Sequence, residues 1–171
     1  GIQAFGNVGR LVGAKAAALG MRVKAIDPFL SPAQISAGGA EPVADLKQLY
    51  SGCDYLSIHI PATPQTIGSI GYELISSMPE GAVLVNTARK EVIDEAGLER
   101  ALEERPDLCY VTDVAPDNIA RLKEKFGSRV FATPKKMGAQ TLEANLNAGL
   151  AAARQICAFF KDGDTRFQLN R

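Results

Sequence analysis

The chain has 171 residues, of which 46% are hydrophobic, 22% are charged and 6% are aromatic. Lysine and arginine together number 19, as do aspartate and glutamate, so the formal net charge is zero. This balance argues against a nucleic-acid-binding module, which depends on an excess of positive charge. No apolar run approaches the roughly 20 residues of a membrane helix. We therefore expect a soluble globular chain that binds neither nucleic acid nor membrane.

Cysteine and histidine are scarce. The three cysteines, Cys53, Cys109 and Cys157, form no CxxC pair, which predicts buried thiols in a reducing compartment and no disulfide or zinc framework. His59 is the single histidine, and no metal site is predicted. The chain starts at Gly1 without a start Met or a signal peptide, so we expect a piece of a longer protein.

Short runs rich in valine and isoleucine alternate with longer helical patterns. The predicted strands are Gly1–Phe5, Arg22–Asp27, Cys53–Ile58, Ala82–Asn86, Leu108–Asp113 and Arg129–Ala132. The predicted helices are Asn7–Leu19, Ala44–Tyr50, Tyr72–Ser77, Glu95–Glu104, Ile119–Phe126 and Thr141–Phe160. Apolar strands separated by helices predict a parallel sheet covered on both faces. The predicted fold class is α/β, a doubly wound parallel sheet.

A glycine-rich turn follows the first predicted strand. Gly6, Asn7, Val8 and Gly9 open a helix of small residues, and Ala4 stands where the usual G-x-G-x-x-G fingerprint has its first glycine. Such a turn lets the backbone approach a pyrophosphate, and the helix N-terminus supplies N–H donors. Asp27 ends the next strand, where a carboxylate accepts ribose hydroxyls and repels a 2′-phosphate. The pattern predicts NAD in preference to NADP; an ordinary tight turn with a surface aspartate is the alternative.

Polar residues also follow the later strands. In parallel sheets the carboxyl ends of the strands meet at one edge, where ligands bind. The segments concerned are His59-Ile60-Pro61-Ala62-Thr63-Pro64-Gln65-Thr66, Asn86-Thr87-Ala88-Arg89, Asp113-Val114 and Thr133-Pro134-Lys135-Lys136-Met137-Gly138. We expect these residues to converge on one crevice.

The order H-x-P-x-T-x-x-T, N-T-A-R, strand-end D-V and T-P-x-x-x-G resembles the D-2-hydroxyacid dehydrogenase family from Gly1 to about the end of the last helix. The resemblance implies a Rossmann-type NAD-binding domain over residues 1–160, with residues 161–171 returning toward an absent substrate domain. It also implies a cytoplasmic enzyme and a homodimer. In the family, the helix that corresponds to the long last helix supports the dimer interface.

The resemblance assigns roles to single residues. Arg89 and Lys135 are the predicted catalytic residues: Arg89 binds the substrate carboxylate and polarises the carbonyl that forms at C2. Asp113 is expected to hold the nicotinamide carboxamide, and His59 to pack on the cofactor without acid–base duty. The predicted cofactor-binding set is Gly6, Asn7, Val8, Gly9, Asp27, His59, Ile60, Pro61, Thr66, Thr87, Ala88, Arg89, Asp113 and Gly138.

The sequence departs from the family at the proton carrier. Usual members have T-P-H-x-G-G with a glutamate beyond the strand-end D-V, whereas this chain has Lys135 and no glutamate there. A histidine base gains basicity from a carboxylate partner, but a carboxylate would keep a lysine protonated. Lys135 is therefore the predicted proton carrier, and the alternatives are phosphate binding or a surface position. Three alternatives stay open for the missing glutamate: its role is taken by Asp117, by Asn118 or by no residue.

The Lys135-Lys136-Met-Gly-Ala-Gln-Thr stretch resembles the family branch of phosphoglycerate dehydrogenases that carry lysine in the histidine position. The resemblance implies NAD-dependent oxidation of a D-2-hydroxy acid, with 3-phospho-D-glycerate preferred, at the entry to serine biosynthesis. One alternative is a dehydrogenase acting on glyoxylate or hydroxypyruvate. Another is a non-catalytic NAD-sensing module similar to co-repressors.

Overall fold

The computed structural model describes residues 1–136 and 141–170. By their internal contacts the residues form two compact units, Gly1–Lys135 and Lys136–Arg171. The domain limit at residue 160 expected from the sequence stays a prediction. No helix within the described ranges is long and apolar enough to cross a membrane.

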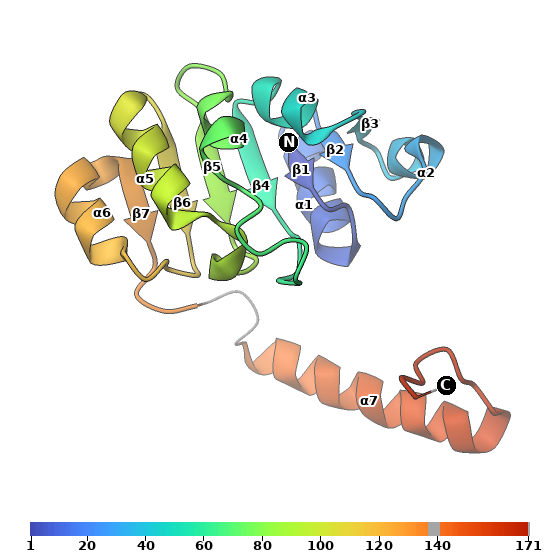
Figure 1. Ribbon diagram of the computed structural model, residues 1–171. Helices are drawn as coiled ribbons and strands as arrows, with labels where there is room; N and C mark the ends of the chain where they lie inside the picture. The colour runs from blue at the N-terminus through green and yellow to red at the C-terminus, as the bar shows by residue number, and fades with distance from the viewer. Residues whose placement is uncertain (137–140, 171) are drawn as a thin grey trace. The chain divides into compact units, whose positions relative to one another are not determined.

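The first unit is built on a seven-stranded sheet in the order β3-β2-β1-β4-β5-β6-β7 (Figure 1). Every neighbouring pair of strands is parallel. The order runs outward in both directions from β1, which confirms the predicted doubly wound α/β class and the Rossmann-like topology. The strands are β1 (Ile2–Gln3), β2 (Lys24–Ile26), β3 (Glu41–Pro42), β4 (Tyr55–Ile58), β5 (Val83–Asn86), β6 (Cys109–Thr112) and β7 (Val130–Ala132).

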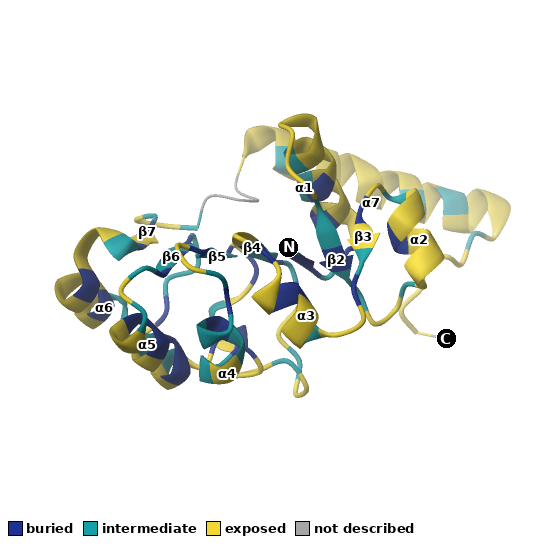
Figure 2. Cartoon of the chain, turned by 90° about the horizontal axis from the view of Figure 1, so that it is seen from above, coloured by how far each residue is buried: buried dark blue, intermediate teal, exposed yellow. Residues whose placement is uncertain are grey.

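Helices lie on both sides of this sheet, as Figure 2 shows from above: α3, α4 and α5 lie on one side, and α1 lies on the other beside β1 and β2. On the α1 side, Tyr55 of β4 and Phe131 of β7 are each 55% exposed, so this part of the face is not covered in the first unit. The helices are α1 (Asn7–Ala18), α2 (Pro32–Ala37), α3 (Leu46–Ser51), α4 (Tyr72–Ser76), α5 (Glu95–Glu104) and α6 (Ile119–Phe126), with single 3-10 turns η1 (Lys90–Val92) and η2 (Gly127–Arg129). Two apolar clusters correspond to the two faces. The larger contains Leu56, Leu84 and Tyr110 with side chains of α3–α6, and the smaller contains Ile2, Phe5, Ala25 and Ile35.

Two elements were absent from the expectation. Helix α2 begins with a capping box, in which the Ser31 hydroxyl accepts from the Gln34 N–H and the Gln34 side chain accepts from the Ser31 N–H. Pro32 occupies the first helical turn, where its missing N–H costs nothing. Strand β3 is only two residues long and includes Pro42, so it has no apolar alternation to read.

The register of the strands aligns their last residues. Gln3 is opposite both Ile26 and Ile58, Ile58 is opposite Asn86, and Asn86 is opposite Thr112. Thr112 is in turn opposite Ala132. The first residue after each strand therefore lies on one edge of the sheet, the lower edge in Figure 1. This edge carries, in spatial order, Asp27, Ala4, His59, Thr87, Asp113 and Thr133.

The second unit consists mainly of helix α7 (Leu142–Asp162). Its first turn is capped by the Thr141 hydroxyl, which accepts from the Ala144 N–H at 3.0 Å. It ends at Gly163, whose φ of 66° lies in the left-handed region. The helix predicted over Thr141–Phe160 is thus confirmed to within two residues at its ends.

Among the described residues, Ala4 is the one non-glycine residue with a positive φ, which is 72°. The left-handed conformation costs an L-residue about 1–2 kcal/mol. A glycine avoids this cost, but its unfolded state has more conformational entropy, which offsets part of the gain in stability. We expect Ala4→Gly to raise the free energy of unfolding by about 0.5–1 kcal/mol, measured by denaturant titration. Ala14→Gly, within the right-handed helix α1, is the matched control and should lower it by about 1 kcal/mol. A loss of stability in Ala4→Gly as large as in the control would contradict this reading.

Candidate functional site

A cleft of about 620 Å³ opens at the carboxyl ends of β1, β2 and β4. Nine of the residues predicted to bind a cofactor line it, namely Gly6, Asn7, Val8, Gly9, Asp27, His59, Ile60, Pro61 and Thr66. A neighbouring cavity of about 580 Å³ is largely apolar and shares six lining residues with the cleft, namely Ala4, Asp27, Pro28, Ile60, Gln65 and Thr66. Both volumes are in the range of small-molecule sites. The position, outside the carboxyl ends of parallel strands, is where open α/β sheets bind ligands.

The glycine turn leaves space for an anion at the start of α1. A Cβ on Gly9 would lie 2.2 Å from the Ala4 carbonyl oxygen, so only glycine allows α1 to approach β1 this closely. A Cβ on Gly6 would meet no atom within 4 Å, because this position faces open space. No side chain caps α1 among the described residues, so its first N–H groups are available to a ligand. The turn therefore fits a pyrophosphate.

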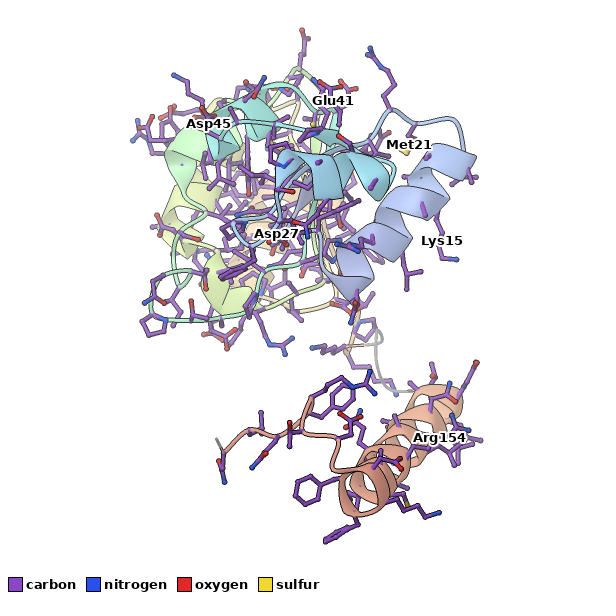
Figure 3. The ribbon with its side chains drawn as sticks, turned by 90° about the vertical axis from the view of Figure 1, so that its right-hand side faces the viewer. Lys15, Met21, Asp27, Glu41, Asp45 and Arg154 are labelled. Atoms are coloured by element: carbon purple, nitrogen blue, oxygen red, sulfur yellow. The ribbon has the colours of Figure 1, made fainter. Side chains whose placement is uncertain are left out.

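Asp27 lies near the amino end of α1, while Met21 and Glu41 lie toward the opposite edge of the sheet (Figure 3). Its Oδ2 accepts from the Phe5 N–H at 2.8 Å and its Oδ1 from the Phe29 N–H at 2.9 Å. A carboxylate has about four acceptor positions, so two bonds leave room for further donors. The carboxylate thus fits a ribose diol and would repel a phosphate.

The loop after β4 forms another wall of the cleft. The Thr66 hydroxyl donates to the Pro61 carbonyl at 2.6 Å and accepts from the Thr63 N–H at 2.8 Å, which ties the loop together. The Nε2 of His59 lies 3.0 Å from the Ser57 hydroxyl. Burial lowers the pKa of His59, so the imidazole is neutral at neutral pH. A neutral ring fits a packing surface against a cofactor.

The remaining predicted residues lie beside the cleft and do not line it. Thr87, Ala88 and Arg89 follow β5, Asp113 follows β6, and Lys135 follows β7, all on the same edge of the sheet. Arg89 is exposed and its Nη1 donates to the Ala88 carbonyl at 2.8 Å. Lys135 is also exposed. Gly138 lies outside the described residues.

The two candidates for the missing glutamate have different surroundings. The Asp117 carboxylate accepts from Lys90 at 2.5 Å, an exposed ion pair. The backbone N–H groups of Asp117 and Asn118 donate to the Glu95 carboxylate at 2.7 and 3.3 Å. Glu95 thereby fixes the loop after β6 to the first turn of α5. In the part of the chain that the structure describes, no carboxylate forms an ion pair with Lys135.

Sequence reasoning did not single out several residues that shape this edge. Asn86 was noted only as part of N-T-A-R, yet it is fully buried and bonded to the Arg89 loop. Buried Gln3 accepts from the Tyr50 hydroxyl at 2.7 Å, and burial raises the pKa of Tyr50. A polar residue ending an apolar strand was the available signal for Gln3 and Asn86. Phe29, which lines the cleft, had no such signal.

Residues 1–143 match a family described as D-isomer specific 2-hydroxyacid dehydrogenase, NAD binding domain. The chain belongs to this family. The NAD-binding character expected from the turn and Asp27 is thereby confirmed, while the roles of individual residues stay predictions. The turn at the start of α1 fits the diphosphate of an adenosine diphosphate group, and the Asp27 carboxylate fits its ribose.

The names of individual relatives are consistent with this family. A D-3-phosphoglycerate dehydrogenase of Methanocaldococcus jannaschii is 34% identical over 157 residues, 91% of this chain and 30% of the relative. A D-3-phosphoglycerate dehydrogenase of Synechocystis is 36% identical over 159 residues, 91% of this chain and 28% of the relative. The crystal structure of an Entamoeba histolytica 3-phosphoglycerate dehydrogenase with NAD+ bound is 46% identical, with a TM-score of 0.87, over 99% of this chain and 54% of that chain. The chain thus spans about half or less of these proteins.

The two turn glycines should separate folding from cofactor binding. We expect Gly6→Ala to weaken NAD binding roughly tenfold or more, because its methyl enters the open space at the start of α1, with little change in melting temperature. Gly9→Ala should lower both the affinity for NAD and the melting temperature, because its methyl collides with the Ala4 carbonyl. Calorimetric NAD titration and thermal unfolding measure the two effects. Unchanged NAD affinity in Gly6→Ala would show that the pyrophosphate does not lie there.

Proposed function

We propose that the protein to which this chain belongs oxidises a D-2-hydroxy acid with NAD, most readily 3-phospho-D-glycerate to 3-phosphohydroxypyruvate. The observation that carries the proposal is the 46% identity, over 99% of the chain, to a 3-phosphoglycerate dehydrogenase. Relatives named D-3-phosphoglycerate dehydrogenase at 34% and 36% identity support the same substrate. The predicted homodimer and cytoplasmic location are part of this proposal.

The cleft residues hold the cofactor in this proposal. The N–H groups of Asn7 and Val8 bind the pyrophosphate, and Asp27 accepts the adenosine ribose hydroxyls. His59, Ile60, Pro61 and Thr66 pack against the cofactor, and Asp113 holds the carboxamide near Thr87 and Ala88. The nicotinamide, when bound, supplies the hydride acceptor.

Arg89 and Lys135 act on the substrate. The planar fork of Arg89 binds the carboxylate and polarises the C2 oxygen. Lys135 takes the hydroxyl proton. None of the ion pairs among the described residues involves Lys135, which supports this role, because a carboxylate partner would keep the amine protonated. Because Asp117 is paired with Lys90, we assign Lys135 no orienting carboxylate.

The proposal is tested by measuring NADH formation by the natural-length protein. We expect the highest kcat/KM with 3-phospho-D-glycerate, compared with glycolate, D-glycerate and D-lactate under the same conditions. Preference for an unphosphorylated acid would favour the alternative hydroxyacid dehydrogenase. NAD binding without turnover of any of these acids would favour the sensing module.

Lys135 is tested by Lys135→Met in the natural-length protein. Loss of a positioned base should lower kcat by roughly 10²–10⁴-fold while NAD affinity changes little. Lys15→Met is a matched control, because Lys15 is an exposed lysine on α1 away from the strand ends (Figure 3). Near-normal turnover by Lys135→Met would end the assignment of Lys135 as proton carrier.

A further inference from the structure

The buried polar residues of the sheet gather at one level. Among the described residues, Gln3, Asn86 and Thr112 are the buried polar ones, at 5%, 0% and 1% exposure. They end β1, β5 and β6, and the register places them in one row with Ile58 between Gln3 and Asn86. This row lies directly before the edge that carries the candidate site. Burying polar groups is unfavourable unless they are hydrogen-bonded, so their bonds indicate what the row supports.

Asn86 is bonded to the three-residue loop that follows it. Its side-chain Oδ1 accepts from the Ala88 N–H at 3.0 Å, and its Nδ2 donates to the Arg89 carbonyl at 2.9 Å. The same Nδ2 lies 3.5 Å from the hydroxyl of buried Tyr110. One amide therefore accepts at one point of the loop and donates at another. Neither an apolar side chain nor a carboxylate can make both bonds.

The strand end that carries Asn86 is itself held from β6. The Thr112 hydroxyl donates to the Asn86 carbonyl at 2.7 Å and accepts from the Val114 N–H at 3.0 Å. The loops that carry Arg89 and Asp113 are thus connected through two buried side chains.

The guanidinium of Arg89 depends on the same loop. Arg89 has an extended backbone, φ −144° and ψ 139°, directly before η1, and its Nη1 donates to the Ala88 carbonyl. Both ends of the Ala88–Arg89 segment are therefore fixed: the N–H of Ala88 by Asn86 Oδ1, and the carbonyl of Arg89 by Asn86 Nδ2. A shift of this segment would displace and turn the fork that a carboxylate must meet in two parallel bonds.

We propose that Asn86 is a positioning residue that sets the Arg89 loop for binding the substrate carboxylate. This rests on the proposed function, in which Arg89 binds that carboxylate. Asn86 does not touch the substrate; it acts through the loop backbone. Removing its amide leaves the Ala88 N–H and the Arg89 carbonyl without their partner, and the loop then samples other positions.

The main test is Asn86→Ala in the natural-length protein. We expect the KM for the hydroxy acid to rise roughly tenfold or more and the Kd for NAD to rise by a smaller factor, because in the proposed function this loop meets only the nicotinamide end of the cofactor while other loops form the cleft. Ile75→Val, a buried change in α4 away from this edge, controls for general loss of stability. A KM no higher than in the control, or an equal loss of NAD affinity, would overturn the proposal.

A second variant separates positioning from packing. Asn86→Asp keeps the shape, but its carboxyl donates to the Arg89 carbonyl only when protonated. The ratio of variant to wild-type KM should therefore fall as the pH is lowered. A ratio independent of pH, with full stability, would contradict the proposed donor role.

A third measurement does not need turnover. Amide hydrogen exchange at Ala88 should be at least roughly tenfold faster in Asn86→Ala than in wild type, because its N–H loses its acceptor. If wild type oxidises none of the acids yet exchange accelerates, the proposed function fails and the loop restraint holds. If wild type is active and neither KM nor exchange changes, the inference about Asn86 fails alone.

Discussion

Backbone pairing between parallel strands is the constraint on which the site depends. Side-chain interactions alone cannot align residues that are far apart in sequence, as Asp27, His59, Thr87 and Asp113 are. The register does so, because β2, β1, β4, β5 and β6 end level with one another. A slip of one residue in any pair would also turn the apolar side chains of that strand to the other face. The two apolar clusters therefore hold the ligand edge in place.

Beyond the strand ends, side chains take over from the ladder. The loops leave the sheet at residues whose backbone groups have no strand partner, and short polar side chains supply one. Asp27 does so for Phe5 and Phe29, Thr66 for Pro61 and Thr63, and Asn86 for Ala88 and Arg89. These bonds fix the backbone of loops whose apolar residues Phe5, Ile60 and Ala88 are buried in the two clusters. Hydrogen bonds within the chain that order these loops lower the cost of ordering them on binding.

The fold was predictable because its strands are continuous apolar runs and its longer helices have clear limits. Helix α5 was predicted at its observed bounds, and strand β5 to within one residue. Helix α2 and strand β3 were not predicted, because α2 buries a single residue, Ile35, and so has no apolar stripe, and β3 contains Pro42 and no apolar alternation. For the site, strand-end polarity predicted residues that share one edge of the sheet, but those after β5, β6 and β7 do not line the cleft, and the roles of all of them stay predictions. It could not predict that Asn86 bonds the Arg89 carbonyl, because that depends on the path of the loop. Nor does an alanine in place of the first glycine reveal that Ala4 keeps a positive φ.

In the proposed function, in which Asp27 accepts the adenosine ribose hydroxyls, its two hydrogen bonds to backbone N–H groups restrict how cofactor preference can change. To accept a 2′-phosphate, the negative charge at this position must be removed. Its two oxygens, however, also hold the N–H groups of Phe5, next to the glycine turn, and of Phe29. An apolar replacement would relieve the repulsion and at the same moment release both sides of the cleft. Evolution or engineering toward NADP therefore has to keep acceptors for both N–H groups, although asparagine and serine each offer one oxygen where Asp27 uses two, or has to rebuild the turn in the same step.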